Sequence, residues 1–224
     1  MNKFERILIN LYILLLIYLN LKSGIFFKNH WVIDLLLTII FSLFSIFIHK
    51  LVQNYTAYLY KDYNIKISGL LNLYKFFYIS FSGIIPFIFF KYGWSNSSLL
   101  EKITFKSKNS SQKIIILLSG ILINLIIGVF FALLIASIEK TSFLNLSATL
   151  LLFSKINIFY AIFSLLPIPP LDGWFILLSI FKFKINLKHI EFYGELLLIT
   201  LFITGIFDKF IPLIGNYIIN YFIL

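Results

Sequence analysis

Cysteine is absent from this chain of 224 residues, and acidic residues are few. The lack of cysteine excludes disulfides, iron–sulfur clusters, thiolate nucleophiles and zinc–thiolate sites. Only 9 residues are Asp or Glu and 3 are His, so any metal site would have to be built from this small set of side chains. Charged residues make up 12% of the chain, about half the share found in soluble domains, which excludes a water-exposed globule.

Apolar residues dominate the chain, at 60% of all residues with a mean hydropathy of +0.97. So much apolar surface in a chain of this length requires lipid as its main solvent. The net charge is +10, but the lysines are scattered between apolar runs, which is typical of membrane topology and not of a nucleic-acid groove. We therefore predict an all-α polytopic membrane protein, a single domain over residues 1–224 that contacts the lipid bilayer and binds no nucleic acid.

The apolar runs predict about six transmembrane helices, plus or minus one, because a helix needs about 20 residues to cross the hydrocarbon. The first run follows basic residues without an A-x-A cleavage site, which predicts a retained signal-anchor helix and leaves a cleaved signal peptide as the alternative. The third contains Gly83 and Pro86 and predicts a tilted or broken helix. Between the second and third runs, residues 65–73 predict a short membrane-associated β-hairpin or edge strand. The runs cover residues 7–21, 31–56, 76–90, 114–138, 146–166, 192–207 and 210–224.

The lysines between the runs predict which loops are cytoplasmic. Residues 91–113 carry five lysines and Glu101, and Lys182, Lys184 and Lys188 mark a second basic stretch. By the positive-inside rule we expect both stretches on the cytoplasmic side.

Ionisable side chains within or beside the apolar runs are candidates for function, because they are costly in lipid. Asp34 and Glu195 are explained most simply as carboxylates at helix starts, where the helix dipole favours them. Lys155 either reaches an interface or bonds a neighbouring helix. His49 near the end of the second run and Asp172 after a proline-rich break are stronger candidates, although a lone histidine is more often structural than a ligand.

Two further patterns concern packing. Gly120, Asn124 and Gly128 are four residues apart, which places them on one helix face where small residues admit a neighbouring helix. Residues 165–173 read LLPIPPLDG, and their three prolines predict the end of the fifth helix. Backbone carbonyls left without partners at membrane depth are tolerated only inside protein or against a cavity.

The LLPIPPLDG segment resembles the signature of the site-2 protease family, the intramembrane zinc metalloproteases, and specifically its small bacterial members. The preceding residues 156–159 are similar to the approach to that signature, with Ser164 in place of the usual asparagine. Shorter similarities at residues 57–62, 69–83, 92–94 and 119–124 make the resemblance collinear from about residue 46 to residue 174. It implies a site-2 protease-like bundle in a bacterial plasma membrane, with membrane peptides or proteins as partners.

In that family an HExxH helix supplies two histidine ligands and a glutamate that activates water, and the aspartate of LDG is the third ligand. Here the pentapeptide is HKLVQ, so His49 and Asp172 remain, Lys50 stands at the glutamate and Gln53 at the second histidine. Catalytic zinc needs three protein ligands, and loss of the general base alone costs about 10² to 10⁴ in rate. The resemblance therefore implies an inactive homologue without zinc. It implies substrate-binding or packing roles for Gly120, Asn124, Ser164, Pro167, Pro169, Pro170 and Gly173.

The bundle predicts two contacts at this degenerate site. Ligand atoms of His49 and Asp172 should lie roughly 3 to 5 Å apart, given metal bonds near 2.1 Å. We also expect Lys50 to form an ion pair with Asp172, its cation replacing the charge of the lost metal.

Two alternatives stay open at this point. One is an active zinc metalloprotease that uses His49, Asp172 and a third ligand such as His30 or His189, with a deprotonated Lys50 as a conceivable base. The other is a transporter or channel component, for which the sequence offers no inverted repeat and no paired broken helices.

Overall fold

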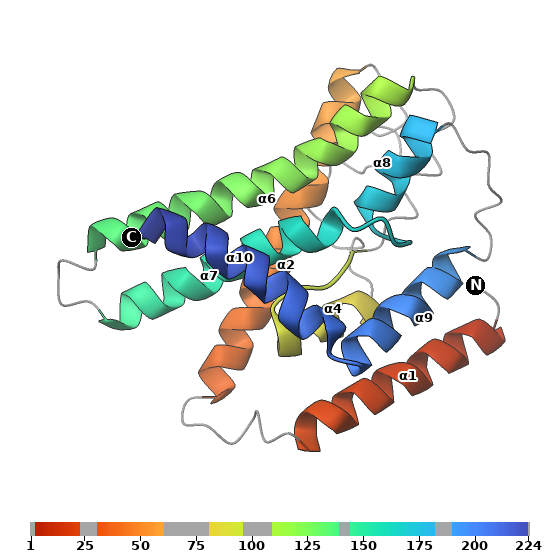
Figure 1. The fold of residues 1–224 in the computed structure, drawn as a ribbon, viewed down its shortest axis with the longest axis horizontal. Coiled ribbons are helices and arrows are strands. Elements are labelled where there is room, and N and C mark those ends of the chain that lie inside the picture. The colour runs from red at the N-terminus through yellow and green to blue at the C-terminus, as the bar shows by residue number, and fades with distance from the viewer. Residues whose placement is uncertain are drawn as a thin grey trace.

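The fold is built from α-helices throughout the part of the chain that the structure, a computed structural model, describes: residues 3–22, 31–60, 81–95, 109–138, 144–181 and 190–223 (Figure 1). The predicted hairpin at residues 65–73 lies outside these residues, as do His30, His189 and the basic stretch at Lys182, Lys184 and Lys188. The helices are α1 (Lys3–Lys22), α2 (Trp31–Leu59), α4 (Phe81–Phe90), α6 (Ser110–Ile138), α7 (Leu144–Ser164), α8 (Asp172–Phe181), α9 (Ile190–Ile203) and α10 (Ile206–Ile223).

Three long apolar helices form the centre of the bundle: α6 and α7 run side by side, and α2 crosses them (Figure 1). The predicted stripe of small residues on α6 makes this packing possible. A side chain at Gly128 would collide with Ile158 of α7, and the Ser154 hydroxyl donates a 2.7 Å hydrogen bond to the Gly128 carbonyl. The prediction that this face packs against neighbouring helices is confirmed.

The described residues contain fewer candidate membrane spans than the sequence predicts for the chain. Among the described helices, only α2, α6 and α7 are long and apolar enough to cross a membrane singly, over Val32–Leu59, Ser110–Ser137 and Leu146–Ser164. Helices α9 and α10 pass the same test only as a pair, and they are bent by 82° at a short break. The described residues therefore hold three candidate spans, or four if the bent pair is one span, and they do not support six.

The break between α9 and α10 explains part of the difference. Gly205 adopts a φ of +70°, a left-handed conformation that glycine accepts without strain and that ends a helix. Composition alone cannot distinguish such a bent pair from two separate crossings.

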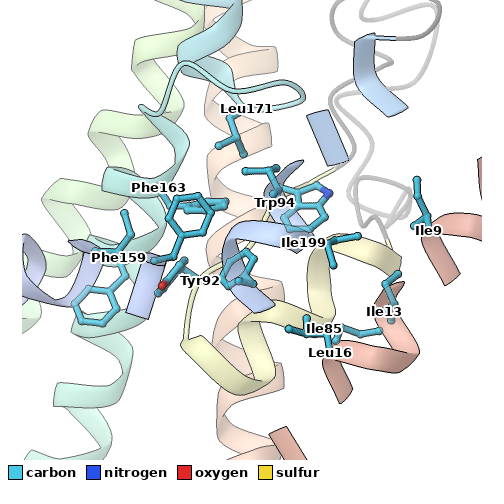
Figure 2. Packing of buried hydrophobic residues seen from close by; sticks show 14 of the residues in the cluster. Ile9, Ile13, Leu16, Ile85, Tyr92, Trp94, Phe159, Phe163, Leu171 and Ile199 are labelled. Carbon is cyan, nitrogen blue, oxygen red and sulfur yellow. The ribbon is translucent and has the colours of Figure 1, made fainter. Parts of the chain in front are cut away.

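An aromatic core fills the space where α7, α9, α10 and the segment after α4 meet (Figure 2). The Tyr92 ring packs against Phe163 with centroids 5.2 Å apart, and Trp94 stacks on Phe202 at 6.3 Å. The backbone at Trp94 touches Gly83 of α4, where any side chain would collide with the Trp94 carbonyl. This packing fixes residues 92–95 beside the end of α7.

The proline-rich segment ends α7 as predicted. Helix α7 stops at Ser164, residues 165–171 form turns, and α8 begins at Asp172. Backbone hydrogen bonds from Ile168 to Leu166 (2.8 Å) and from Leu171 to Ile168 (2.9 Å) satisfy carbonyls within these turns. A side chain at Gly173 would collide with the Leu165 carbonyl, so the start of α8 folds directly back onto the end of α7.

The two carboxylates expected at helix starts have different outcomes. Asp34 lies in the first turn of α2, as predicted. Glu195 does not begin a helix, because α9 starts five residues earlier, at Ile190, and Glu191 is the acidic residue of its first turn. The prediction for Glu195 was wrong because the apolar run that we used to place the helix begins later than the helix itself.

Candidate functional site

The candidate site lies where α2, α6 and α8 meet. Helix α2 supplies His49, Lys50 and Gln53, α6 supplies Asn124, and the first residue of α8 is Asp172. All five side chains are buried. The break after α7 is what carries Asp172 back to α2, so the bundle joins residues that are more than 120 positions apart in sequence.

His49 and Asp172 form a direct hydrogen bond. The His49 Nε2 atom lies 2.7 Å from the Asp172 Oδ2 atom, and the Asn124 Nδ2 atom lies 3.4 Å from His49 Nδ1. A neutral imidazole satisfies both contacts, with Nε2–H donating to the carboxylate and Nδ1 accepting from the amide. His49 and Asp172 thus lie together, but the 2.7 Å between their atoms is shorter than the predicted span of about 3 to 5 Å.

Lys50 contacts the second oxygen atom of the Asp172 carboxylate. Its Nζ atom lies 3.6 Å from Asp172 Oδ1 and donates a 3.0 Å hydrogen bond to Gln53 Oε1. Gln53 in turn donates from Nε2 to the Leu117 carbonyl of α6, at 3.2 Å. The predicted ion pair between Lys50 and Asp172 is therefore present.

Gly120 allows α6 to lie directly on this network. A Cβ atom at residue 120 would be only 2.7 Å from both His49 Nε2 and Gln53 Cγ. Because real Cβ atoms do not approach other atoms so closely, residue 120 must lack a side chain for His49 and Gln53 to keep their positions.

A small cavity of about 10 Å³ adjoins the charged pair, which is room for about one water molecule. Its polar lining includes Ser95, Tyr160 and Ser164, and the Tyr160 hydroxyl donates to Ser95 Oγ at 3.4 Å. Ser164 thus lies beside the site. The complete lining is Lys50, Trp94, Ser95, Tyr160, Ser164, Pro170, Leu171 and Asp172.

Tyr160 is a site residue that the sequence reasoning missed. Its ring packs against His49 with centroids 5.0 Å apart, and its side chain is buried. The available signal was its spacing of four residues from Ser164, which places both on one face of α7.

The remaining sequence candidates lie elsewhere. Of the three prolines, Pro170 lines the cavity, Pro169 packs against Gly194 of α9, and Pro167 is exposed. Asp34 is fifteen residues before His49 on the same helix, or about 22 Å away. Lys155 lines a different cavity.

The residues present do not fit a zinc ion. Two atoms bound to one tetrahedral zinc lie about 3.4 Å apart, whereas His49 Nε2 and Asp172 Oδ2 lie 2.7 Å apart, at hydrogen-bonding distance from each other. Gln53 contributes its oxygen to Lys50. Within the described ranges, no group of three or more His, Cys, Asp or Glu side chains could hold a metal.

Comparison with known proteins gives one relevant similarity. The chain is 27% identical over 169 residues to the Bacillus subtilis (strain 168) protein named "Putative zinc metalloprotease YwhC", covering 71% of this chain and 77% of that protein. No family model matches the chain, and no solved structure matches it. The similarity supports the resemblance to metalloproteases that the LLPIPPLDG segment indicates.

Proposed function

We propose that this chain is a site-2 protease-like integral membrane protein that has lost catalysis and binds membrane peptides or proteins, in the plasma membrane of a bacterium. The observation that carries the proposal is the position of Lys50. This lysine stands where the family has its catalytic glutamate, and its ammonium group lies 3.6 Å from the carboxylate of Asp172. A cation there repels a metal ion and cannot accept a proton while it is charged.

Lys50, at the position of the family's catalytic glutamate, compensates the buried charge of Asp172. Asp172 is buried, and a buried carboxylate needs a compensating charge or hydrogen bonds. Lys50 supplies the charge and His49 the hydrogen bond, so the carboxylate has protein partners on both of its oxygen atoms. Because the adjoining cavity of about 10 Å³ is too small for a peptide, we place peptide binding outside it. The resemblance implies a strand-like substrate; residues 65–73, which the sequence suggests as its partner, lie outside the described residues.

Metal analysis of the purified protein tests this proposal. We expect no stoichiometric zinc in the natural chain and a partial gain of zinc in the double variant Lys50→Glu with Gln53→His, which restores the HExxH ligands. The matched control adds Asp172→Ala to that double variant, and it should lose the gained zinc. Stoichiometric zinc in the natural chain, lost on Asp172→Ala alone, would overturn the proposal.

An active metalloprotease is the second candidate, and the similarity to a protein named as a zinc metalloprotease favours it. It requires His49, Asp172 and one further ligand; the sequence candidates His30 and His189 lie outside the described residues. This candidate predicts zinc in the natural chain, so the same metal analysis separates the two functions.

A further inference from the structure

The small cavity beside Asp172 is enclosed by protein. Its volume of about 10 Å³ is the space that one water molecule needs, and it excludes any larger ligand. All of the residues that line it are buried, so a molecule held there is separated from the surroundings of the protein. The cavity is therefore a candidate site for a ligand of the size of water.

Lys50 and Asp172 meet at this cavity without a direct hydrogen bond. Lys50 Nζ and Asp172 Oδ1 are 3.6 Å apart, which permits an ion pair. Hydrogen bonds from nitrogen to oxygen are shorter, at about 2.7 to 3.2 Å. An ammonium group has three N–H donors, and within the described part of the chain that of Lys50 uses one, toward Gln53 Oε1 at 3.0 Å. Polar groups separated by more than about 3.5 Å are commonly bridged by water, so the gap between these two charges suits a bridging molecule.

Hydroxyl groups complete the polar lining of the cavity. Ser95, Tyr160 and Ser164 belong to the lining, and each carries a hydroxyl that can donate or accept a hydrogen bond. The hydrogen bond from the Tyr160 hydroxyl to Ser95 Oγ is long, at 3.4 Å, and both oxygen atoms have capacity for a further partner. A buried water makes about three hydrogen bonds, and one cation, one carboxylate and one hydroxyl supply that number.

We propose that this cavity binds one water molecule that bridges the charged pair, accepting a hydrogen bond from Lys50 Nζ and donating one to Asp172 Oδ1. Its second hydrogen atom is donated to one of the hydroxyl oxygens of the lining. A metal cation does not suit the same space, because it would lie beside the positive charge of Lys50.

The bridging water changes the chemical character of the site. It hydrates an ion pair whose two residues are buried, and so replaces part of the solvation that burial removes. The water also accepts a hydrogen bond from a cation that cannot take up a proton while it is charged. It is therefore held in place and is not activated for attack on a peptide. This inference concerns the charged site alone and does not require the proposed peptide binding.

X-ray radiolytic footprinting of the purified full-length protein in detergent tests the assignment. Ionised water gives hydroxyl radicals, a water held inside the protein oxidises the side chains beside it, and mass spectrometry locates the products. Tyr160 is 1% exposed and lines the cavity, whereas Tyr92 is 0% exposed and does not line it. We expect Tyr160 to be oxidised at least fivefold faster than Tyr92. Equal oxidation rates of the two tyrosines would refute the bound water.

Ser164→Thr tests whether the water lies in this cavity, because the substitution adds a methyl group to the lining. We expect the oxidation rate of Tyr160 to fall to that of Tyr92. The matched control is Ser147→Thr, the same change on the same helix at a residue that does not line the cavity, and it should leave the rate unchanged. An unchanged rate in folded Ser164→Thr would show that the radicals arise elsewhere and would refute the placement. If Ser164→Thr does not fold, the comparison of Tyr160 with Tyr92 in the natural chain decides alone.

Discussion

Lys50 and Asp172 face each other in the protein interior, and each compensates the charge of the other. The lysine is 3% exposed and the aspartate 5%, and their charged atoms are 3.6 Å apart. His49 contacts the same carboxylate and contributes a hydrogen bond. Removal of one partner from a buried pair is more damaging than removal of both, because the remaining charge stays buried without compensation.

We therefore expect Lys50→Met to lower the free energy of unfolding by about 3 kcal/mol, the usual cost of breaking a buried ion pair. SDS-induced unfolding of the protein in mild detergent measures the change. The same substitution at the exposed Lys209 should cost less than about 0.5 kcal/mol. Combining Lys50→Met with Asp172→Asn should recover part of the loss, since the two residues are coupled. A loss for Lys50→Met no greater than that for Lys209→Met would show that the ion pair does not stabilise the fold.

The packing of α6 on α2 depends on Gly120, which has no side chain. A Cβ atom at residue 120 would lie 2.7 Å from His49 Nε2 and from Gln53 Cγ, so the helix would have to move away or both side chains would have to shift. Close packing of this kind tolerates little added volume.

Gly120→Ala is expected to lower the free energy of unfolding by about 1 to 3 kcal/mol, the range for added volume in a well-packed interior. This expected loss is opposite in sign to the effect of helix propensity, because alanine in a helix interior is otherwise favoured over glycine by up to about 1 kcal/mol. Detergent unfolding of the natural and variant proteins measures the difference, with Ile126→Ala on the exposed side of α6 as a control for substitutions on that helix. Increased stability of Gly120→Ala would mean that α6 does not lie against His49 and Gln53 as described.

The sequence predicted those parts of the site that depend on local motifs. The proline segment ends α7, and the pairing of His49 and Lys50 with Asp172 follows from motifs whose positions in a bundle are known by resemblance. Tyr160 was missed because no motif marks it and its role arises only from packing against His49. The small cavity joins Lys50, Ser95 and Ser164, which come from distant parts of the chain, and only the assembled helices bring them together.

At the scale of the whole molecule, the number of spans depends on the bend between α9 and α10. Two separate crossings would place the bend at an aqueous face, whereas a single broken span would place it within the membrane. The 82° angle and the left-handed Gly205 show that α9 and α10 are not one straight helix, and we predict that together they form one broken span. The absence of cysteine makes the question accessible, because a single introduced cysteine is the only thiol in the chain.

We expect Thr204→Cys, at the bend, to react slowly with a membrane-impermeant maleimide in bilayer vesicles opened to both sides, because the broken span keeps residue 204 away from bulk water. Asn109→Cys is the matched control: Asn109 is exposed and precedes α6, so its thiol should react at least tenfold faster. Denaturation in SDS should make both thiols equally reactive, which excludes a blocked cysteine. Rapid labelling of Thr204→Cys in intact bilayers would place the bend in water, and α9 and α10 would then be separate elements, as the apolar runs alone predict.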